Sequence, residues 1–341
     1  MTAPSALLRR LPLITLYLTE RCNSRCVSCD YWRHGRADIS LESVTALLPG
    51  LTALGTRAVL ISGGEPLVHP EWAEIAQALR ARGLTLWLLT SGLALAKHAK
   101  TIAALFESVT VSLDGTNRAT YATIRGLDAF DKVCAGIRAA ADAGASVGVR
   151  VTVQRANYRE LPGFIHLARK TGAQQVSFLA ADVSNPHAFG RKDGTAPDVA
   201  LNPDDLPGLE QILNVMEREH AADFHSGFIA ESPRKLRRIL QYYSALCGRV
   251  AYPQERCNAP EFSAVIDAER RVQPCFFIRG PAEARLDGSL DDVLNSDSMR
   301  TLRRTIREGR RAECVTCVCP LWRDPNDVTG LELAPAQNAS V

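Results

Sequence analysis

Short apolar runs alternate with amphipathic stretches from residue 11 to about residue 180. Runs such as Ala58 to Ser62 are apolar on both faces, which is typical of strands in a parallel sheet covered by helices. The stretches between them have helical periodicity, and several end at a glycine that marks a helix C-terminus. Strands are predicted at 13–18, 58–62, 85–90, 109–113, 147–153 and 176–179, and helices at 40–50, 70–82, 94–106, 131–143 and 159–171. The pattern indicates an α/β fold of six βα units.

The alternation stops after residue 180. Residues 181–203 are polar and contain several glycines and prolines, so they predict a long loop above the C-terminal ends of the strands. Such a loop acts either as a lid or as a solvated linker. Asn202-Pro203 and Ser232-Pro233 have the residues of an N-cap and a first helical position, so helices are predicted from there to about His220 and Leu246.

The length and charge of the chain limit its organisation and its partners. A chain of 341 residues predicts one large α/β domain and a smaller one, which we expect at 11–220 and 251–325, with a helical bridge at 221–250 and a tail at 326–341. The net charge of +3 gives no reason to expect a nucleic-acid partner. No apolar run has the length of a membrane span, and the first ten residues lack a signal-peptide core, so no membrane partner and a cytoplasmic protein are expected.

The chain contains ten cysteines, which in a reducing compartment indicate metal ligands or reactive thiols rather than disulfides. Cys22, Cys26 and Cys29 have the spacing C-x3-C-x2-C just after the first predicted strand. Three thiolates can hold three corners of a [4Fe–4S] cube and leave the fourth iron open to another ligand. A zinc site with a distant fourth ligand is the alternative.

Glycines and polar residues follow the next three predicted strands. Gly63-Gly64-Glu65-Pro66 follows the second strand, and glycine lets the backbone approach a ligand closely. Ser91 follows the third strand, and Ser112 and Asp114 end the fourth. Arg125, further along, suits a carboxylate ligand, although a structural ion pair explains it equally well. Because functional groups of such folds lie at the C-terminal ends of parallel strands, these residues predict one pocket.

Together these motifs resemble the radical S-adenosylmethionine (SAM) superfamily, over about residues 11–320. The resemblance implies a partial (β/α)6 TIM-like barrel. It implies that Cys22, Cys26 and Cys29 bind a [4Fe–4S] cluster whose open iron is chelated by SAM. It also implies reductive cleavage of SAM to a 5′-deoxyadenosyl radical, which removes a hydrogen atom from the substrate.

The same resemblance implies roles for the strand-end residues. Gly63, Gly64, Glu65 and Pro66 match the motif that holds the amino end of the SAM methionine. Ser112 and Asp114 match a motif that contacts the SAM carboxylate or ribose. Ser91 stands where the family usually has asparagine.

Six more cysteines lie near the end of the chain, namely Cys247, Cys257, Cys275, Cys314, Cys317 and Cys319. Strands predicted at 262–266 and 271–273 form a hairpin that would bring Cys257 and Cys275 together. Helices are predicted at 292–294 and 299–307, before the C-x2-C pair of Cys314 and Cys317. Two thiols from the hairpin and two from this pair would make a four-thiolate site.

This second group resembles the twitch form of the SPASM domain, a small α+β cluster-binding domain. The resemblance implies an auxiliary [4Fe–4S] cluster on Cys257, Cys275, Cys314 and Cys317. A four-cysteine zinc site is the alternative. Cys247 and Cys319 are alternates for any of the four ligands. Arg270 stands where the family usually has glycine ahead of the second hairpin cysteine, so the geometry of this turn is left open.

The resemblance covers several reactions. We expect a small polar biosynthetic intermediate of sugar, aminocyclitol or nucleoside type as substrate, and oxidation with the auxiliary cluster as electron acceptor; decarboxylation and epimerisation are also open. A ribosomal-peptide maturase is an alternative, made less favourable by the short segment before the first strand. The molybdopterin-precursor cyclase resembles the barrel but spaces its C-terminal cysteines as C-x2-C-x13-C. A zinc-stabilised binding protein without activity would have no use for the strand-end motifs.

Residues 300–311 contain six arginines on a predicted helix. We interpret them as a solvated helix face. The alternative is a docking surface for an acidic electron donor such as flavodoxin or ferredoxin, since opposite charges steer association.

Overall fold

The computed structural model describes residues 7–191 and 197–323, so the expected tail at 326–341 lies outside the described residues. Within them, the strands form a single curved sheet in the order β6-β5-β4-β3-β2-β1-β7-β8. The first six strands are β1 Leu13–Thr19, β2 Ala58–Gly63, β3 Thr85–Thr90, β4 Ser108–Ser112, β5 Val147–Val153 and β6 Gln175–Ala180. Each pairs in parallel with the next, which confirms the partial barrel.

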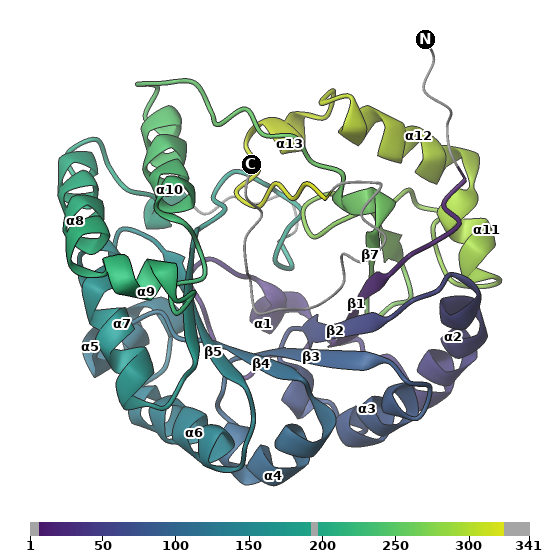
Figure 1. Cartoon of the computed structure of the whole chain (residues 1–341). Coiled ribbons are helices and arrows are strands. Elements are labelled where there is room, and N and C mark those ends of the chain that lie inside the picture. Colours follow the sequence, from purple (N-terminus) through teal and green to yellow (C-terminus); the bar gives the residue numbers. More distant parts are fainter. Residues whose placement is uncertain (1–6, 192–196, 324–341) are drawn as a thin grey trace.

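Helices lie around the outside of this sheet (Figure 1). They are α2 Leu41–Ala53, α3 Trp72–Arg80, α4 Leu95–Leu105, α5 Arg118–Arg125, α6 Phe130–Asp142 and α7 Leu161–Lys170. The short helix α1 Tyr31–His34 lies instead toward the middle of the barrel (Figure 1). Short 3-10 turns lie at η1 Pro66–Val68, η2 Tyr158–Glu160, η3 Pro197–Val199 and η4 Ala259–Glu261. The predicted βα order is thus confirmed, whereas the motif helices α1 and α5 were not predicted.

The alternation of β5 shows how the strands supply both a core and an inner face. Val147, Val149, Val151 and Val153 are buried in the main hydrophobic core, while the residues between them are only partly buried. On β1 the partly buried Leu13 belongs to the face that lines a cavity inside the barrel. Parallel strands therefore send apolar side chains outward to the helices and present mixed side chains to the interior.

The segment after β6 contains α8 Leu206–Glu219, α9 Ala221–His225 and α10 Pro233–Leu246. Ser232 caps α10 as predicted, because its side chain accepts a hydrogen bond from the Lys235 amide. The predicted start of helix α8 at Asn202-Pro203 is wrong. Residues 202–205 form a turn in which Asp205 accepts a hydrogen bond from the Asn202 amide, and the helix begins at Leu206.

The predicted hairpin is confirmed: β7 Ser263–Ile266 and β8 Val272–Gln273 pair antiparallel. Unexpectedly, β7 also pairs in parallel with β1, with Leu13 opposite Ser263, so the hairpin extends the barrel sheet. Helices α11 Leu290–Asn295, α12 Asp297–Arg307 and α13 Ala312–Val315 follow it (Figure 1). The division at 220 and 250 stays a prediction. In the described ranges no helix has the length and apolarity needed to cross a bilayer.

Candidate functional site

The first cysteine group occupies the loop between β1 and α1. The Cys29 amide donates to the Cys26 carbonyl at 3.3 Å, which folds the loop back on itself. The loop is also held from outside, because the amides of Arg25 and Val27 donate to carbonyls of the last turn of α5 at 2.9 and 3.0 Å. Cys22 lies on the same loop, and it is close enough to Cys29 to add to the rise in the pKa of that thiol. The three predicted thiols are therefore brought together.

Arg125, the last residue of α5, extends its side chain to the cysteine loop. Its Nη1 lies 3.2 Å from the Cys26 sulfur and 3.5 Å from a carboxylate oxygen of Asp114, and its Nη2 donates to the Ser112 carbonyl at 2.9 Å. Burial would lower the pKa of Arg125, but Cys26 and Asp114 outweigh it and raise the pKa. The structural ion pair that the sequence left open is thus present, and the same guanidinium also contacts the Cys26 sulfur.

The Gly-Gly-Glu-Pro turn packs against the start of the cysteine loop. The Gly64 amide donates to the Thr19 carbonyl at 2.7 Å, and the Glu65 amide to the Arg21 carbonyl at 2.8 Å. A Cβ on Gly64 would lie 2.3 Å from the Arg21 carbonyl oxygen, and Gly63 has a φ of 125°. Only glycine fits both positions, so the sequence of this turn follows from its close approach to the cysteine loop.

Glu65 is almost fully buried, and it ties this turn to the end of β3. Its carboxylate accepts hydrogen bonds from the Thr90 hydroxyl at 2.7 Å, from the Ser91 amide at 2.6 Å and from the Leu67 amide at 3.2 Å. The Ser91 hydroxyl in turn donates to Asn23 of the cysteine loop at 3.2 Å. Glu65 therefore holds two strand-end turns in place, and its direct contact with SAM stays a prediction.

Asp114 connects the ends of β4 and β5. Its carboxylate accepts a hydrogen bond from the Thr152 amide at 2.7 Å, and its carbonyl accepts one from the Asn157 side chain at 3.0 Å. Burial raises the pKa of Asp114, although Arg125 opposes the shift. Ser112 contributes its carbonyl to Arg125. A role of either side chain toward SAM stays a prediction.

Three buried polar atoms around this loop have no hydrogen-bond partner in the described part of the chain: Ser24 Oγ, Tyr121 OH and Arg125 Nε. Buried polar groups without a partner indicate a missing ligand or water. Burial also raises the pKa of the Cys22 thiol to about 11 and that of Cys29 to about 12, so these thiols need a metal cation nearby to become thiolates. Soft thiol donors with unsatisfied polar neighbours fit an iron–sulfur cluster and a polar ligand on it.

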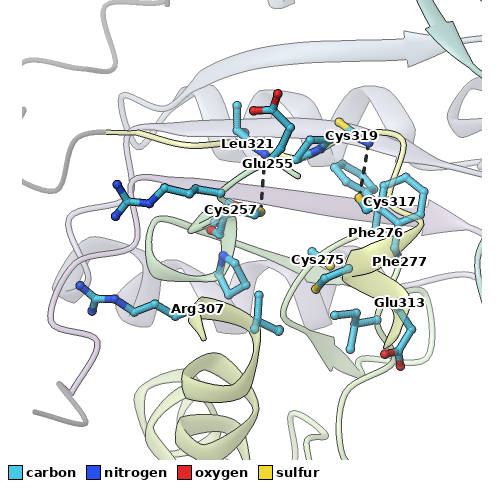
Figure 2. Close-up of a pocket in the computed structure, with 18 of the residues that line it drawn as sticks. Glu255, Cys257, Cys275, Phe276, Phe277, Arg307, Glu313, Cys317, Cys319 and Leu321 are labelled. Atoms are coloured by element: carbon cyan, nitrogen blue, oxygen red, sulfur yellow. Dashed lines mark hydrogen bonds between the residues drawn. The ribbon is translucent and has the colours of Figure 1, made fainter. Parts of the chain in front are cut away.

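The second cysteine group lines a cavity of about 340 Å³. Its thiols are those of Cys257, Cys275, Cys314, Cys317 and Cys319. Figure 2 shows four of them, with the Leu321 amide donating to the Cys257 sulfur at 3.5 Å and the Cys319 amide to the Cys317 sulfur at 3.4 Å. Such amide contacts suit sulfur atoms that carry negative charge.

Cys247 is not among the residues that line this cavity. It caps the C-terminus of α10, and its thiol donates to the Leu201 carbonyl at 3.7 Å. Of the two alternates, the structure therefore brings Cys319 to the predicted four thiols and leaves Cys247 elsewhere. The choice among the five thiols at the cavity stays open.

No three Cys, His, Asp or Glu side chains in residues 7–191 and 197–323 already form a group that could hold a single metal ion. A cubane cluster distributes its cysteine ligands over different iron atoms, so its sulfur ligands lie farther apart than the ligands of one ion. Burial raises the pKa of Cys275 to about 12 and that of Cys314 to about 11, as it raises the pKa values of Cys22 and Cys29. The thiols grouped around this cavity suit a cluster and zinc alike, so the choice of a cluster stays a prediction.

Residues 182–191 connect the two cysteine groups, which the sequence did not predict. Arg191 and Asp182 form an ion pair at 3.0 Å with both side chains 2% exposed, and Arg191 also donates to the Ser28 carbonyl at 2.9 Å. Asn185 donates to the Phe277 carbonyl, two residues after Cys275, at 2.6 Å. This part of the expected lid or linker is thus a buried clamp between the first and second cysteine loops.

Tyr17 also lies between the two groups. Its ring is 6.1 Å from that of Tyr31, near Cys29, and 6.5 Å from that of Phe276, next to Cys275. Burial raises the pKa of Tyr17, and Cys275 and Cys29 add to the shift. Its place on the inner face of β1 is the only signal that the sequence offers for it.

Comparisons with known proteins agree with this geometry. Residues 16–168 match the model of the radical SAM superfamily. The chain is 30% identical over 191 residues to Fe-coproporphyrin III synthase of Methanosarcina barkeri, covering 51% of this chain and 46% of that protein. It is 34% identical over 174 residues to GTP 3′,8-cyclase of Erythrobacter litoralis, covering 48% and 52%. The chain thus spans about half the length of these curated relatives.

The fold is also similar to a solved structure. SuiB of Streptococcus suis bound to SAM has a TM-score of 0.67 at 14% identity, over 91% of this chain and 72% of that one. Members of the matched superfamily bind SAM and a [4Fe–4S] cluster, and the cysteine loop and its neighbours fit both. The part of the chain that contains the cysteine loop, residues 16–168, is thus a domain of the radical SAM superfamily.

Proposed function

We propose that this protein is a radical SAM enzyme that oxidises a small polar biosynthetic intermediate, with an auxiliary iron–sulfur cluster as the electron acceptor. The observation that supports it most is the cavity lined by the second cysteine group. Five thiols meet there, and the buried clamp of residues 182–191 joins it to the first cysteine loop. A site for two electron carriers on one scaffold suits a two-electron oxidation. Decarboxylation and epimerisation of the same kind of substrate are the alternative reactions.

The residues of the chain would divide the work as follows. Cys22, Cys26 and Cys29 would hold the first cluster, and Arg125 would donate a hydrogen bond to the sulfur of Cys26. When bound, the cluster and SAM supply a radical that removes a hydrogen atom from the substrate. Glu65 and the glycines before it keep the strand-end turns fixed against the cysteine loop, so these residues would position a bound SAM relative to the cluster ligands.

The second pocket completes the proposed reaction. Cys257, Cys275, Cys314 and Cys317 hold the auxiliary cluster, with Cys319 as the alternate that also borders the cavity. An electron leaves the substrate radical as a proton leaves the same substrate, which together with the abstracted hydrogen atom balances a two-electron oxidation. A flavodoxin or ferredoxin would supply the electron that starts each turnover.

Peptide modification is the second candidate. SuiB, whose fold this chain shares, has also been solved bound to its precursor peptide SuiA. Cyclisation of a nucleotide is a weaker candidate, since the similarity to GTP 3′,8-cyclases extends over about half of this chain. Both use the same first cluster, so they differ from the main proposal only in substrate and in the use of the second cavity.

Anaerobic reconstitution with iron and sulfide tests the proposal. We expect about eight irons per chain, since each cubane holds four, and release of 5′-deoxyadenosine from SAM on reduction. Replacing Cys22, Cys26 and Cys29 together by alanine should abolish 5′-deoxyadenosine formation. Bound zinc with no SAM cleavage would contradict the proposal.

Single cysteine variants distinguish the two proposed cluster sites. Cys275→Ala should lower the iron content toward four per chain, while Cys247→Ala, outside the cavity, serves as the matched control and should leave it unchanged. Comparing Cys314→Ala with Cys319→Ala decides which thiol is the fourth ligand. Full iron content in Cys275→Ala would refute the auxiliary site alone.

A further inference from the structure

Arg150 lies on the inner face of the barrel, beside the site described above. It is the fourth residue of β5, between Val149 and Val151, whose buried side chains face the helices. In the sheet it is paired with Ser112 of β4 and Ser177 of β6. The alternation of the strand therefore directs Arg150 to the interior. Its side chain is partly exposed, so a ligand can reach it.

The guanidinium of Arg150 is fixed at one end and free at the other. Nε donates to the Ser177 hydroxyl at 2.6 Å, and Ser177 is 5% exposed. The terminal nitrogens Nη1 and Nη2 have no hydrogen-bond or ion-pair partner among the described residues. An arginine anchored through Nε presents its two outer N–H groups in the geometry that binds carboxylate or phosphate bidentately.

The charges around Arg150 favour an anion. Lys235, in the first turn of α10, lies close enough to act on the same neighbours as Arg150, namely Glu231 and Cys319. Glu231 is the nearby carboxylate, and it accepts a hydrogen bond from the Phe178 amide at 2.7 Å. Burial raises the pKa of Glu231 although both cations oppose the shift, so this carboxylate is a weak counter-ion. Two cations thus face one carboxylate.

The position also suits the proposed chemistry. Arg150 precedes Thr152 by two residues, and Thr152 binds Asp114 at the strand-end pocket. Two residues of strand correspond to about 7 Å. On the other side Cys319, which borders the second cavity, lies within the field of Arg150. A substrate group at Arg150 would therefore hold the rest of a small molecule between the SAM pocket and the second cysteine group.

We propose that Arg150, positioned by Ser177 and supported by Lys235, binds an anionic group of the substrate, a carboxylate or a phosphate, inside the barrel. This inference rests on the proposed function only in calling the ligand a substrate. It narrows the substrate class to acids and phosphate esters and excludes neutral sugars.

Calorimetric titration of the reconstituted, SAM-bound protein with inorganic phosphate and, separately, with succinate tests the inference without turnover. We expect the wild type to bind at least one of the two anions. Arg150→Gln should weaken that binding tenfold or more, and Arg150→Lys, which keeps the charge but not the fork, should weaken it less. Binding of phosphate alone or of succinate alone supports the inference and identifies the group. No binding of either anion by the wild type would overturn it.

Two further variants test whether a general loss of positive charge, or the nearby carboxylate, explains the result. Arg82→Gln removes the same charge from an exposed arginine after α3 and should leave anion binding unchanged. Glu231→Gln can keep the bond to the Phe178 amide but removes the competing charge, so it should tighten anion binding. Equal effects of Arg150→Gln and Arg82→Gln, with unchanged melting temperatures, would refute the site. Failure of the wild type to cleave SAM would contradict the proposed function and leave the anion result standing.

Discussion

Arg270 forms the turn between β7 and β8 with a φ of 64°, in the left-handed region that favours glycine. Its amide donates to the Asp267 carbonyl at 2.8 Å, and Asp267 also accepts bonds from the amides of Glu269 and Arg271. This network holds Arg270 in a conformation that costs a residue with a Cβ roughly 1–2 kcal/mol. The hairpin thus has an arginine in a conformation that glycine adopts without strain.

Replacing Arg270 by glycine should therefore stabilise the protein. Relief of the left-handed strain exceeds the extra chain entropy of glycine, so the free energy of unfolding should rise by about 0.5–1 kcal/mol. Urea unfolding measures it. Arg270→Ala is the matched control, since it also removes the exposed ion pair with Asp287 but keeps the strain. If the alanine variant gained as much as the glycine variant, the strain would not be the cause.

Some residues of the candidate site could be predicted from the sequence and others could not. The cysteines and the strand-end glycines have a fixed spacing, so their place followed from the sequence. Arg125 was predicted at the site, but its contact with Cys26 depends on a helix that no periodicity indicated. Arg150 and Arg191 gave no local signal, because their partners lie far away in the sequence.

Helix α10 is an element whose first residue could be predicted from the sequence. Ser232 accepts a hydrogen bond from the Lys235 amide at 3.3 Å, and Pro233 begins the helix. Ser289 occupies the same position before α11 but makes no such bond. The cap bond satisfies an amide that the helix itself leaves without a partner.

Ser232→Ala should lower the free energy of unfolding by about 1 kcal/mol, because the Lys235 amide loses its acceptor. Ser289→Ala is the comparison, and its effect should stay within about 0.5 kcal/mol. Both are exposed serines, and denaturant unfolding at one pH compares them directly. Equal losses in the two variants would mean that the cap bond contributes nothing.

The strands were predicted closely and the connecting helices less so, for a physical reason. A strand such as β5 shows a strict alternation of buried valines, which does not fit a helix, and its predicted bounds are confirmed. The start of α8 depends instead on a competition. Asp205 is engaged by Tyr158 and by the Asn202 amide, so residues 202–205 form a turn and the helix begins later. That competition involves a residue on another element, which the local pattern cannot include.

At the scale of the whole molecule, the clamp of residues 182–191 links two parts that are distant in the sequence. Arg191→Leu should lower the free energy of unfolding by about 3–5 kcal/mol, because Asp182 would stay buried without its partner. Adding Asp182→Asn in the same chain should restore part of this loss. Urea unfolding of the single and double variants completes the cycle. Additive losses would show that the pair is not coupled.

Metal loading should stabilise the molecule unevenly. Residues 253–261 and 312–323 contain little regular structure, and several of their contacts run through cysteine sulfur. Iron–sulfur reconstitution should therefore slow amide hydrogen exchange there much more than in β3, whose bonds do not depend on metal. Mass spectrometry of the metal-free and loaded protein measures the difference. Cys257→Ala should abolish the added protection and Cys247→Ala should keep it; uniform protection would contradict the prediction.

The parallel pairing of β1 with β7 has a consequence for how the chain is made. Strands β1 to β6 follow one another in both sequence and space, so they can assemble in order as the polypeptide leaves the ribosome. The other edge of β1 has to wait for Ser263, some 250 residues later. Contacts of such high sequence separation form late and slowly. During that interval the strand beneath the first cysteine loop still has an unpaired edge, so the time before residues 263–273 leave the ribosome is the period of greatest risk of aggregation.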